Sequence, residues 1–126
     1  MTLLLDSGAL IALERNDRVM WRRLKAAERA GMVPVSHGGV VGQAWRGRGP
    51  RQALLSMVLE GCDIRVLDEA LGRAAGELLG RTRTSDVVDA ALVLLAEDGD
   101  SIATSDVGDL ESLAVASGRY VELLRT

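Results

Sequence analysis

The sequence predicts an α/β fold, a three-layer α/β/α sandwich in which helices cover both faces of a central parallel sheet. Short apolar runs alternate with longer stretches of helical spacing along the whole chain, which is the pattern of repeated strand–helix units. No linker or low-complexity segment interrupts the 126 residues, and this length suits one folding unit. We therefore predict a single domain that covers residues 1–126.

The first half of the chain is predicted to contain two strands and four helices. An apolar run that stops at Asp6 indicates a buried strand. Pro34 favours a strand start or a sheet edge, and Gly31 is placed to end a helix. Taken in order, these patterns predict a strand at 2–5, helices at 8–14 and 17–30, a strand at 33–35, and helices at 38–45 and 51–59.

The second half is predicted to contain three strands and three helices. Residues 62–67 alternate between polar and apolar side chains, as a half-buried strand does. Asp68 is placed to cap a helix, and the almost wholly apolar stretch after Ser85 indicates a buried one. In order, we predict a strand at 62–67, a helix at 68–79, a loop at 80–84, a helix at 85–97, a strand at 101–104, a helix at 106–116 and a strand at 120–124.

Composition and charge narrow the function classes. The chain carries 15 basic and 18 acidic residues, so a net charge of −3 disfavours nucleic-acid binding by bulk charge alone. A single cysteine and a single histidine exclude an internal disulfide and a Cys/His zinc site. No stretch approaches the ~20 apolar residues of a membrane helix, and the N-terminus lacks a basic signal region. We expect a cytoplasmic protein without a membrane partner.

Acidic residues stand where predicted strands end or helices begin: Asp6, Asp86, Asp89, Asp106 and Asp109. Ligand sites of open parallel sheets lie outside the carboxyl ends of the strands, where both Asp6 and Asp106 fall. Asp89 is the one acid in an otherwise apolar helix, which is costly unless it is paired or metal-bound. Clustered carboxylates repel one another, and a hard dication relieves that repulsion. The pattern predicts a Mg²⁺ or Mn²⁺ site built from Asp6, Asp89 and Asp106.

A purely structural interpretation of these acids is also available. Asp86 and Asp106 are placed to be helix N-caps, and Asp89 and Asp109 to be first-turn acids that the helix dipole favours. For Asp86 and Asp109 the capping and functional interpretations stand level. For Asp6 and Asp89 the pattern favours a site.

Four segments together resemble the PIN-domain family. They are LLLDSGALIAL at 3–13, VVGQAWRG at 40–47, SDVVDAALVLLA at 85–96 and TSDVGDL at 104–110. In length and single-domain form the chain is similar to the VapC toxins of type II toxin–antitoxin pairs. The resemblance implies a Mg²⁺- or Mn²⁺-dependent endoribonuclease, a homodimer and a cognate antitoxin partner. It assigns the catalytic and metal-binding roles to Asp6, Asp89 and Asp106, and auxiliary roles to Asp109 and Asp86.

Gln43 departs from the family pattern, because the resemblance places a Glu there. No Asp or Glu occurs between Glu28 and Glu60 to replace it. An amide carries no charge and cannot act as a base, so the alternative is a catalytically weak PIN-like module that binds RNA or a protein. A phosphoaspartate hydrolase ranks lower, because Asp6 has no second acid nearby and Lys25 is the only lysine.

Basic residues gather between the predicted helices at 38–45 and 51–59. Arg46, Arg48 and Arg51 form a glycine-rich loop that is suited to RNA phosphate, to an acidic antitoxin segment or simply to solvent. Trp45 beside them is expected at a dimer or antitoxin contact. His37 has no nucleophilic partner, so we expect it to be structural or exposed.

Overall fold

The computed structural model describes all residues, 1–126, and contains one five-stranded sheet. Every strand pair in it is parallel, and the strand order is β3-β2-β1-β4-β5. The strands are β1 (Leu3–Leu5), β2 (Val35–His37), β3 (Asp63–Arg65), β4 (Ser101–Thr104) and β5 (Glu122–Arg125). The predicted fold class is confirmed.

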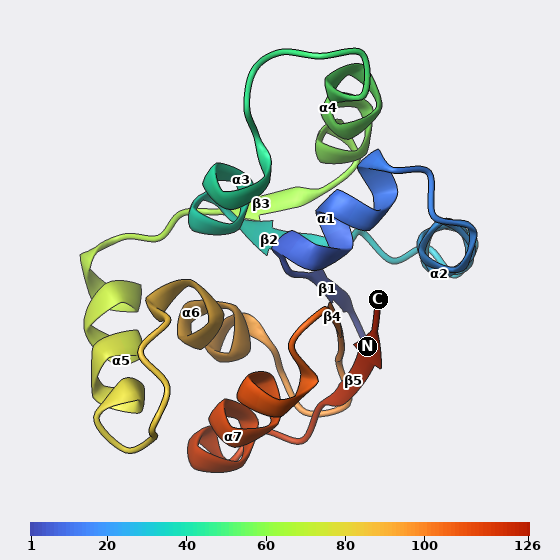
Figure 1. Cartoon of the computed structure of the whole chain (residues 1–126). Helices are drawn as coiled ribbons and strands as arrows, with labels where there is room; N and C mark the ends of the chain where they lie inside the picture. Colours follow the sequence, from blue (N-terminus) through green and yellow to red (C-terminus); the bar gives the residue numbers. More distant parts are fainter.

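Seven helices cover the two faces of the sheet. They are α1 (Ser7–Glu14), α2 (Arg18–Arg29), α3 (Gly38–Ala44), α4 (Gln52–Glu60), α5 (Glu69–Leu79), α6 (Val87–Leu95) and α7 (Val107–Ser117). Figure 1 shows α1 to α4 on one side of the strands and α5 to α7 on the other. None of them has the length and apolar character needed to cross a bilayer.

Strand β1 connects the two halves of the core. Leu3 and Leu5 pack with α1, α2, α3 and α4, whereas Leu4 packs with α5, α6 and α7. This division follows from the strand geometry, because successive side chains point to opposite faces of a sheet. The result is two aliphatic cores with the sheet between them, which is the three-layer arrangement that the sequence predicts.

The order of the strands reverses between β1 and β4. The chain moves outward from β1 to β2 and β3, then returns to place β4 on the other side of β1. Leu5 lies opposite Ala103, so both strands end at the same edge of the sheet. Doubly wound sheets bind ligands at such a switch point, outside the carboxyl ends of the strands. Asp6 directly follows the end of β1, and Asp106 lies two residues beyond the end of β4.

Four predicted elements were wrong by two residues at one end or both. The strands predicted at 33–35, 62–67 and 120–124 occupy 35–37, 63–65 and 122–125, and the helix predicted at 85–97 occupies 87–95. Strand β2 occupies 35–37 rather than 33–35, because Val33 is exposed and the ladder with β3 begins where Val35 meets Asp63. The helix predicted at 85–97 is shorter, since Asp86 caps it and it ends at Leu95. Its first turn is also less buried than predicted, with Val87 40% exposed. The apolar pattern of residues 87–96 does not indicate that the first turn of α6 lies at the edge of the sheet, where solvent reaches it.

Candidate functional site

Asp6 ties the end of β1 to the end of β4. It is the N-cap of α1, where its Oδ1 accepts the N–H of Ala9 at 2.8 Å. Its Oδ2 accepts the N–H of Ser105 at 3.2 Å, and only 3% of the residue is exposed. Burial raises the pKa of this carboxyl group, while hydrogen bonds from Thr104 and nearby backbone N–H groups oppose the rise. Donors from two separate elements thus fix the first predicted ligand.

Close packing at Gly8 keeps the start of α1 against the turn that follows β4. A Cβ atom at this position would lie 2.3 Å from Oγ and 2.5 Å from Cβ of Ser105. Contacts this short are sterically forbidden, so only glycine fits. The absence of a side chain at Gly8 therefore allows Asp6 to approach the segment that carries Asp106.

Asp106 and Asp109 occupy the start of α7. The backbone N–H of Asp106 donates to Thr104 Oγ1 at 2.8 Å, and its Oδ1 accepts the N–H of Asp109 at 3.3 Å. Both residues are exposed. The charge of Asp106 is the main cause that raises the pKa of Asp109. The two carboxylates therefore lie within reach of each other at the open rim of the site.

Asp86 and Asp89 occupy the start of α6. Asp86 caps the helix, with its Oδ1 accepting the N–H groups of Val88 at 2.8 Å and Asp89 at 3.2 Å. Asp89 is half-buried rather than fully buried, which corrects the prediction from its apolar surroundings. Its pKa is raised to about 7, first by burial and then by four carboxylates: those of Asp86, Asp6, Asp106 and Asp109.

The five predicted acids therefore share one electrostatic environment around the starts of α1, α6 and α7. We call this set, Asp6, Asp86, Asp89, Asp106 and Asp109, the aspartate cluster. The only ion pairs of the chain are Arg65–Asp63 at 2.6 Å and Arg73–Glu69 at 2.9 Å, so no cationic side chain neutralises the cluster. Like charges without a counterion suit a cation ligand.

The side chains of the cluster do not form a ready-made cage. No group of three His, Cys, Asp or Glu side chains is arranged to hold a metal ion. Mg²⁺, however, retains several waters and needs only one or two direct carboxylates. The donor set, hard oxygens with excess negative charge, therefore fits such an ion, whereas the present side-chain positions favour the helix caps.

Helix capping accounts for part of the cluster. Asp86 and Asp106 each accept a backbone N–H at a helix start, as the structural interpretation predicts, and Asp6 does the same at α1. Asp89 is different, because its carboxylate accepts no hydrogen bond within the chain and lies among like charges. The helix dipole favours an acid in this first turn, but burial and like charge outweigh it, since they raise the pKa of Asp89. Capping thus leaves Asp89 unexplained.

Two predicted auxiliary features lie on the α3 side of the molecule. Gln43 is half-buried on α3, and its carboxamide makes no hydrogen bond, including to the aspartate cluster. Arg46 folds back on α3, with its guanidinium donating to the carbonyls of Gly42 and Trp45. Arg48 and Arg51 are exposed and make no side-chain contact of this kind.

Two polar residues near these features were missed or misjudged from the sequence. Gln52 is buried and accepts the backbone N–H groups of Arg46 at 2.9 Å and Gly47 at 2.8 Å, which anchors the basic loop. His37 is fully buried, so the exposed alternative was wrong. Its Nδ1 accepts the N–H of Gly39 at 3.1 Å and caps α3.

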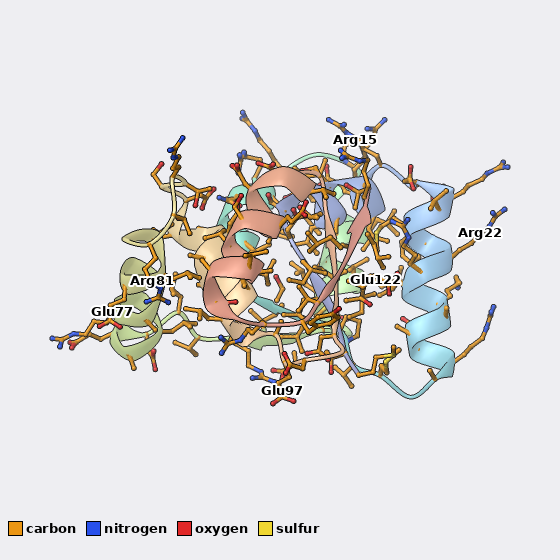
Figure 2. The ribbon with its side chains drawn as sticks, turned by 90° about the horizontal axis from the view of Figure 1, so that it is seen from below. Arg15, Arg22, Glu77, Arg81, Glu97 and Glu122 are labelled. Atoms are coloured by element: carbon orange, nitrogen blue, oxygen red, sulfur yellow. The ribbon has the colours of Figure 1, made fainter.

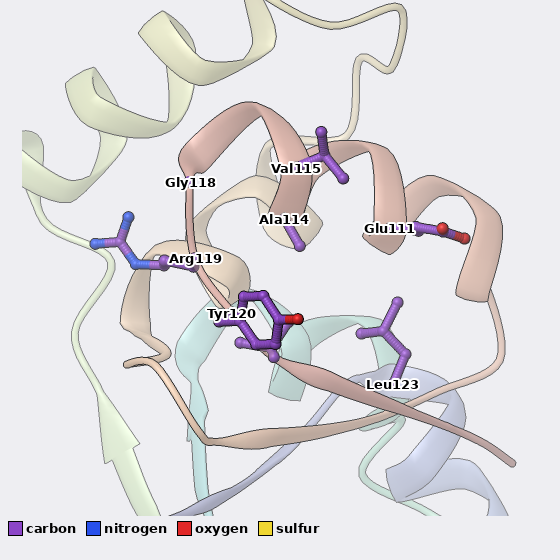
Figure 3. A pocket seen from close by; sticks show the side chains of 8 residues that line it. Glu111, Ala114, Val115, Gly118, Arg119, Tyr120 and Leu123 are labelled. Atoms are coloured by element: carbon purple, nitrogen blue, oxygen red, sulfur yellow. The ribbon is translucent and has the colours of Figure 1, made fainter.

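The largest cavity lies away from the aspartate cluster. It measures about 530 Å³ and lies between α7 and β5, as Figure 3 shows. Val115 and Tyr120 at its rim are strongly exposed. Glu111 is the only acid that lines it. The size of a cavity therefore does not identify the candidate site. The mutual electrostatic effect of the carboxylates in the aspartate cluster identifies it instead.

Comparison with solved structures places the fold among known ones. The chain is similar to one in the crystal structure of VapBC2 from Rickettsia felis bound to a DNA fragment from their promoter. The TM-score is 0.71 at 11% identity, and the match covers 98% of this chain and 98% of that one. Similarity at this identity shows a shared fold. No protein-family model matches the chain, and no curated protein matches it significantly in sequence.

Proposed function

We propose that this protein is a Mg²⁺- or Mn²⁺-dependent endoribonuclease and the toxin component of a VapBC-type toxin–antitoxin pair. One observation carries the proposal: the charges of Asp6, Asp86, Asp106 and Asp109 all act on Asp89, and none of the five takes part in an ion pair. Asp6 and Asp106 follow the two strands at the switch point of the sheet. The structural similarity to a chain of VapBC2 supports the toxin–antitoxin part. A cognate antitoxin is the partner that this part requires.

Three residues of the cluster take the central roles. Asp6, Asp89 and Asp106 are the proposed metal ligands, because they lie after β1, in the first turn of α6 and after β4, and the charges of Asp6 and Asp106 both act on Asp89. A bound dication would lower the pKa of a water and stabilise charge on the phosphate under attack. Asp6 is already oriented by its two backbone donors. Asp86 and Asp109 add negative charge around these ligands, and Asp86 also caps the start of α6.

The test is cleavage of RNA by purified protein with Mg²⁺ or Mn²⁺. We expect Asp6→Asn and Asp89→Asn each to abolish cleavage, and EDTA to do the same. Asp68→Asn is the matched control, because Asp68 also caps a helix through one backbone N–H but lies outside the cluster. Cleavage that survives Asp6→Asn or EDTA would refute the assignment.

A second candidate function is a catalytically weak module that binds RNA or a partner protein. The uncharged Gln43 and the lack of a preformed three-ligand group favour it. Calorimetry with Mn²⁺ separates the two candidates, since a nuclease must take up metal saturably and a binding module need not. Under the nuclease proposal, Gln43→Glu raises the affinity for metal; under the alternative it changes little.

Two contacts complete the proposal. Arg48 and Arg51, together with Arg46, whose guanidinium donates to α3, are proposed to contact RNA phosphate or an acidic antitoxin segment.

The active form is proposed to be a homodimer. Sedimentation equilibrium tests this oligomeric state directly, because a monomer at all concentrations would contradict it.

A further inference from the structure

The loop between α5 and α6 lines a polar groove beside the aspartate cluster. The groove measures about 460 Å³ and is lined by Arg81, Thr82, Arg83 and Thr84 on one side and by residues of α7 on the other. Asp109 and Ser112 are the polar residues of the α7 side. We call it the Arg81–Arg83 groove. Most of its lining is polar or charged, so it suits an ionic ligand rather than an apolar one.

The two arginines of this groove have no partner within the chain. Neither guanidinium takes part in an ion pair or a hydrogen bond, and both residues are exposed. Arg23 and Arg119, by contrast, donate to the backbone carbonyls of Arg125 and Ala96. Two unpaired guanidinium groups separated by one residue are donors that match phosphate oxygens.

The backbone of the loop is held in place. The N–H groups of Arg81 and Thr82 donate to the carbonyls of Leu78 and Leu79 at the end of α5. The hydroxyl of Thr82 lies 3.4 Å from the same Leu79 carbonyl and 3.1 Å from the hydroxyl of Thr84. The threonines are half-buried and the arginines are exposed. The two guanidinium groups therefore lie in solvent, on a loop whose backbone is held by hydrogen bonds. Such an arrangement lowers the ordering cost of binding.

The groove adjoins the aspartate cluster. Asp109 belongs to both, and the loop continues through Ser85 into Asp86, the cap of α6. An anion between Arg81 and Arg83 would therefore lie beside the cluster. A protein with a net charge of −3 and uncompensated aspartates repels a polyanion, unless a local cation anchors it next to them.

We infer that Arg81 and Arg83 bind a backbone phosphate of the RNA strand next to the one that is cleaved. This inference rests on the RNA substrate of the proposed function. It adds a binding subsite that the basic residues around Arg46 do not provide. These two arginines bind the substrate and take no part in the chemical step, so their loss raises KM and leaves kcat nearly unchanged.

The test measures RNA binding separately from cleavage. A fluorescein-labelled 12-nucleotide single-stranded RNA is titrated in EDTA with the wild type and with Arg81→Ala/Arg83→Ala, and anisotropy is recorded. The matched control is Arg22→Ala/Arg29→Ala, which removes the same charge from two exposed, unpaired arginines of α2. Figure 2 shows Arg81 and Arg22 at opposite ends of the molecule.

We expect the groove variant to weaken RNA binding about tenfold or more, and to reduce the slope of log K against log [salt] by about 0.7, the value for one phosphate contact on a single strand. The control should change the dissociation constant less than about twofold, its arginines making no phosphate contact. Equal weakening in both variants, or none in the groove variant, overturns the inference. Melting temperatures equal to that of the wild type show that neither variant has lost its fold.

Two competitors identify the ligand. Inorganic phosphate and poly-glutamate are added at the same charge concentration as unlabelled RNA. Displacement by RNA alone supports a nucleic-acid subsite. Equal displacement by phosphate indicates a small-anion site, and equal displacement by poly-glutamate indicates a surface for acidic protein segments; either result overturns the inference.

The two proposals fail in different ways. If Mg²⁺ and Mn²⁺ give no cleavage but RNA binding still depends on Arg81 and Arg83, the nuclease proposal fails and the groove stands. If cleavage occurs and the groove variant binds and cleaves RNA as the wild type does, the groove fails alone.

Discussion

The ring of His37 is hydrogen-bonded to the backbone carbonyl of Val88, with 2.9 Å between Nε2 and the carbonyl oxygen. A carbonyl can only accept, so Nε2 carries the proton and Nδ1 accepts the N–H of Gly39. The neutral imidazole therefore connects the start of α3 to the first turn of α6, one residue before Asp89. A Cβ atom on Gly39 would lie 2.9 Å from the ring, so a glycine is needed there.

This contact predicts a pH dependence of stability. Burial lowers the pKa of His37 from its usual 6.5, so the unfolded chain takes up a proton at pH values where the folded protein does not. The stability contributed by His37 is full above about pH 6.5 and is lost as the pH falls below it. In urea denaturation, we expect His37→Gln to cost about 1 kcal/mol at pH 7.5 and less at pH 5. A cost independent of pH would contradict this.

Asp89→Asn should stabilise the metal-free protein at pH 8. The pKa of Asp89 is raised from 3.8 to about 7, so ionisation of this group opposes folding. The effect is absent below about pH 3.8, grows as the pH rises and is full above about pH 7. Because the carboxylate is partly solvated, we expect about 1 kcal/mol, or roughly 4 °C in melting temperature. Asp68→Asn, outside the cluster, is the control variant, and an equal gain of stability in it would contradict the prediction.

The same variant tests metal binding without reference to activity. A ligand that binds only the folded state stabilises it, by about 2.7 kcal/mol at a concentration of 100 Kd. We expect Mn²⁺ to raise the melting temperature of the wild type and of Asp68→Asn, and to leave that of Asp89→Asn nearly unchanged. An equal rise in all three proteins would place the ion elsewhere.

Gly8→Ala is expected to destabilise the fold. The added methyl group would overlap Ser105, and overpacking of this kind costs about 1–3 kcal/mol. Gly76→Ala is the control, because nothing lies within 4 Å of its Cβ position in α5. It should stabilise the protein by about 0.5–1 kcal/mol. Chemical denaturation of both variants measures the contrast, and similar effects would exclude the close contact at Ser105.

Gln52→Ala should loosen the basic loop. It removes the acceptor of the Arg46 and Gly47 N–H groups, which then exchange with solvent. We expect faster hydrogen exchange at these two amides, while the amides of the sheet keep their protection. Gln43→Ala should leave the loop unchanged, because the Gln43 carboxamide bonds nothing. Unchanged exchange in Gln52→Ala would mean that the loop is held by other contacts.

Much of the fold could be predicted because its signals are local. The apolar run at 3–5 and the acids that follow β1 and β4 indicated strands that end at one edge. The convergence of Asp6 and Asp106 required one further fact, that β1 and β4 are neighbours, and the structure confirms it. Whether these acids hold a metal remains a prediction.

Residues whose roles depend on distant partners were harder to predict. Asp100 belongs to a turn in the sequence, yet it is buried and accepts the N–H groups of Thr2 and Glu97. His37 and Gln52 likewise bond segments 51 and 38 residues away. Arg81 and Arg83 lie in a loop, where the sequence shows no helical or strand periodicity. The groove that they line exists only because the loop lies beside α7. Spacing along the chain does not encode such pairs.

Because Asp6 and Asp106 act as helix caps, an ion bound by them, as proposed, would compete with backbone N–H groups for their carboxylate oxygens. These caps hold the starts of α1 and α7 without an ion, so the proposed ion would bind to helices that have already formed. Each cap that is surrendered costs about 1 kcal/mol. The fraction of protein that holds the proposed ion would then depend on the free concentration of that ion. At a low concentration the protein would be folded but without its metal.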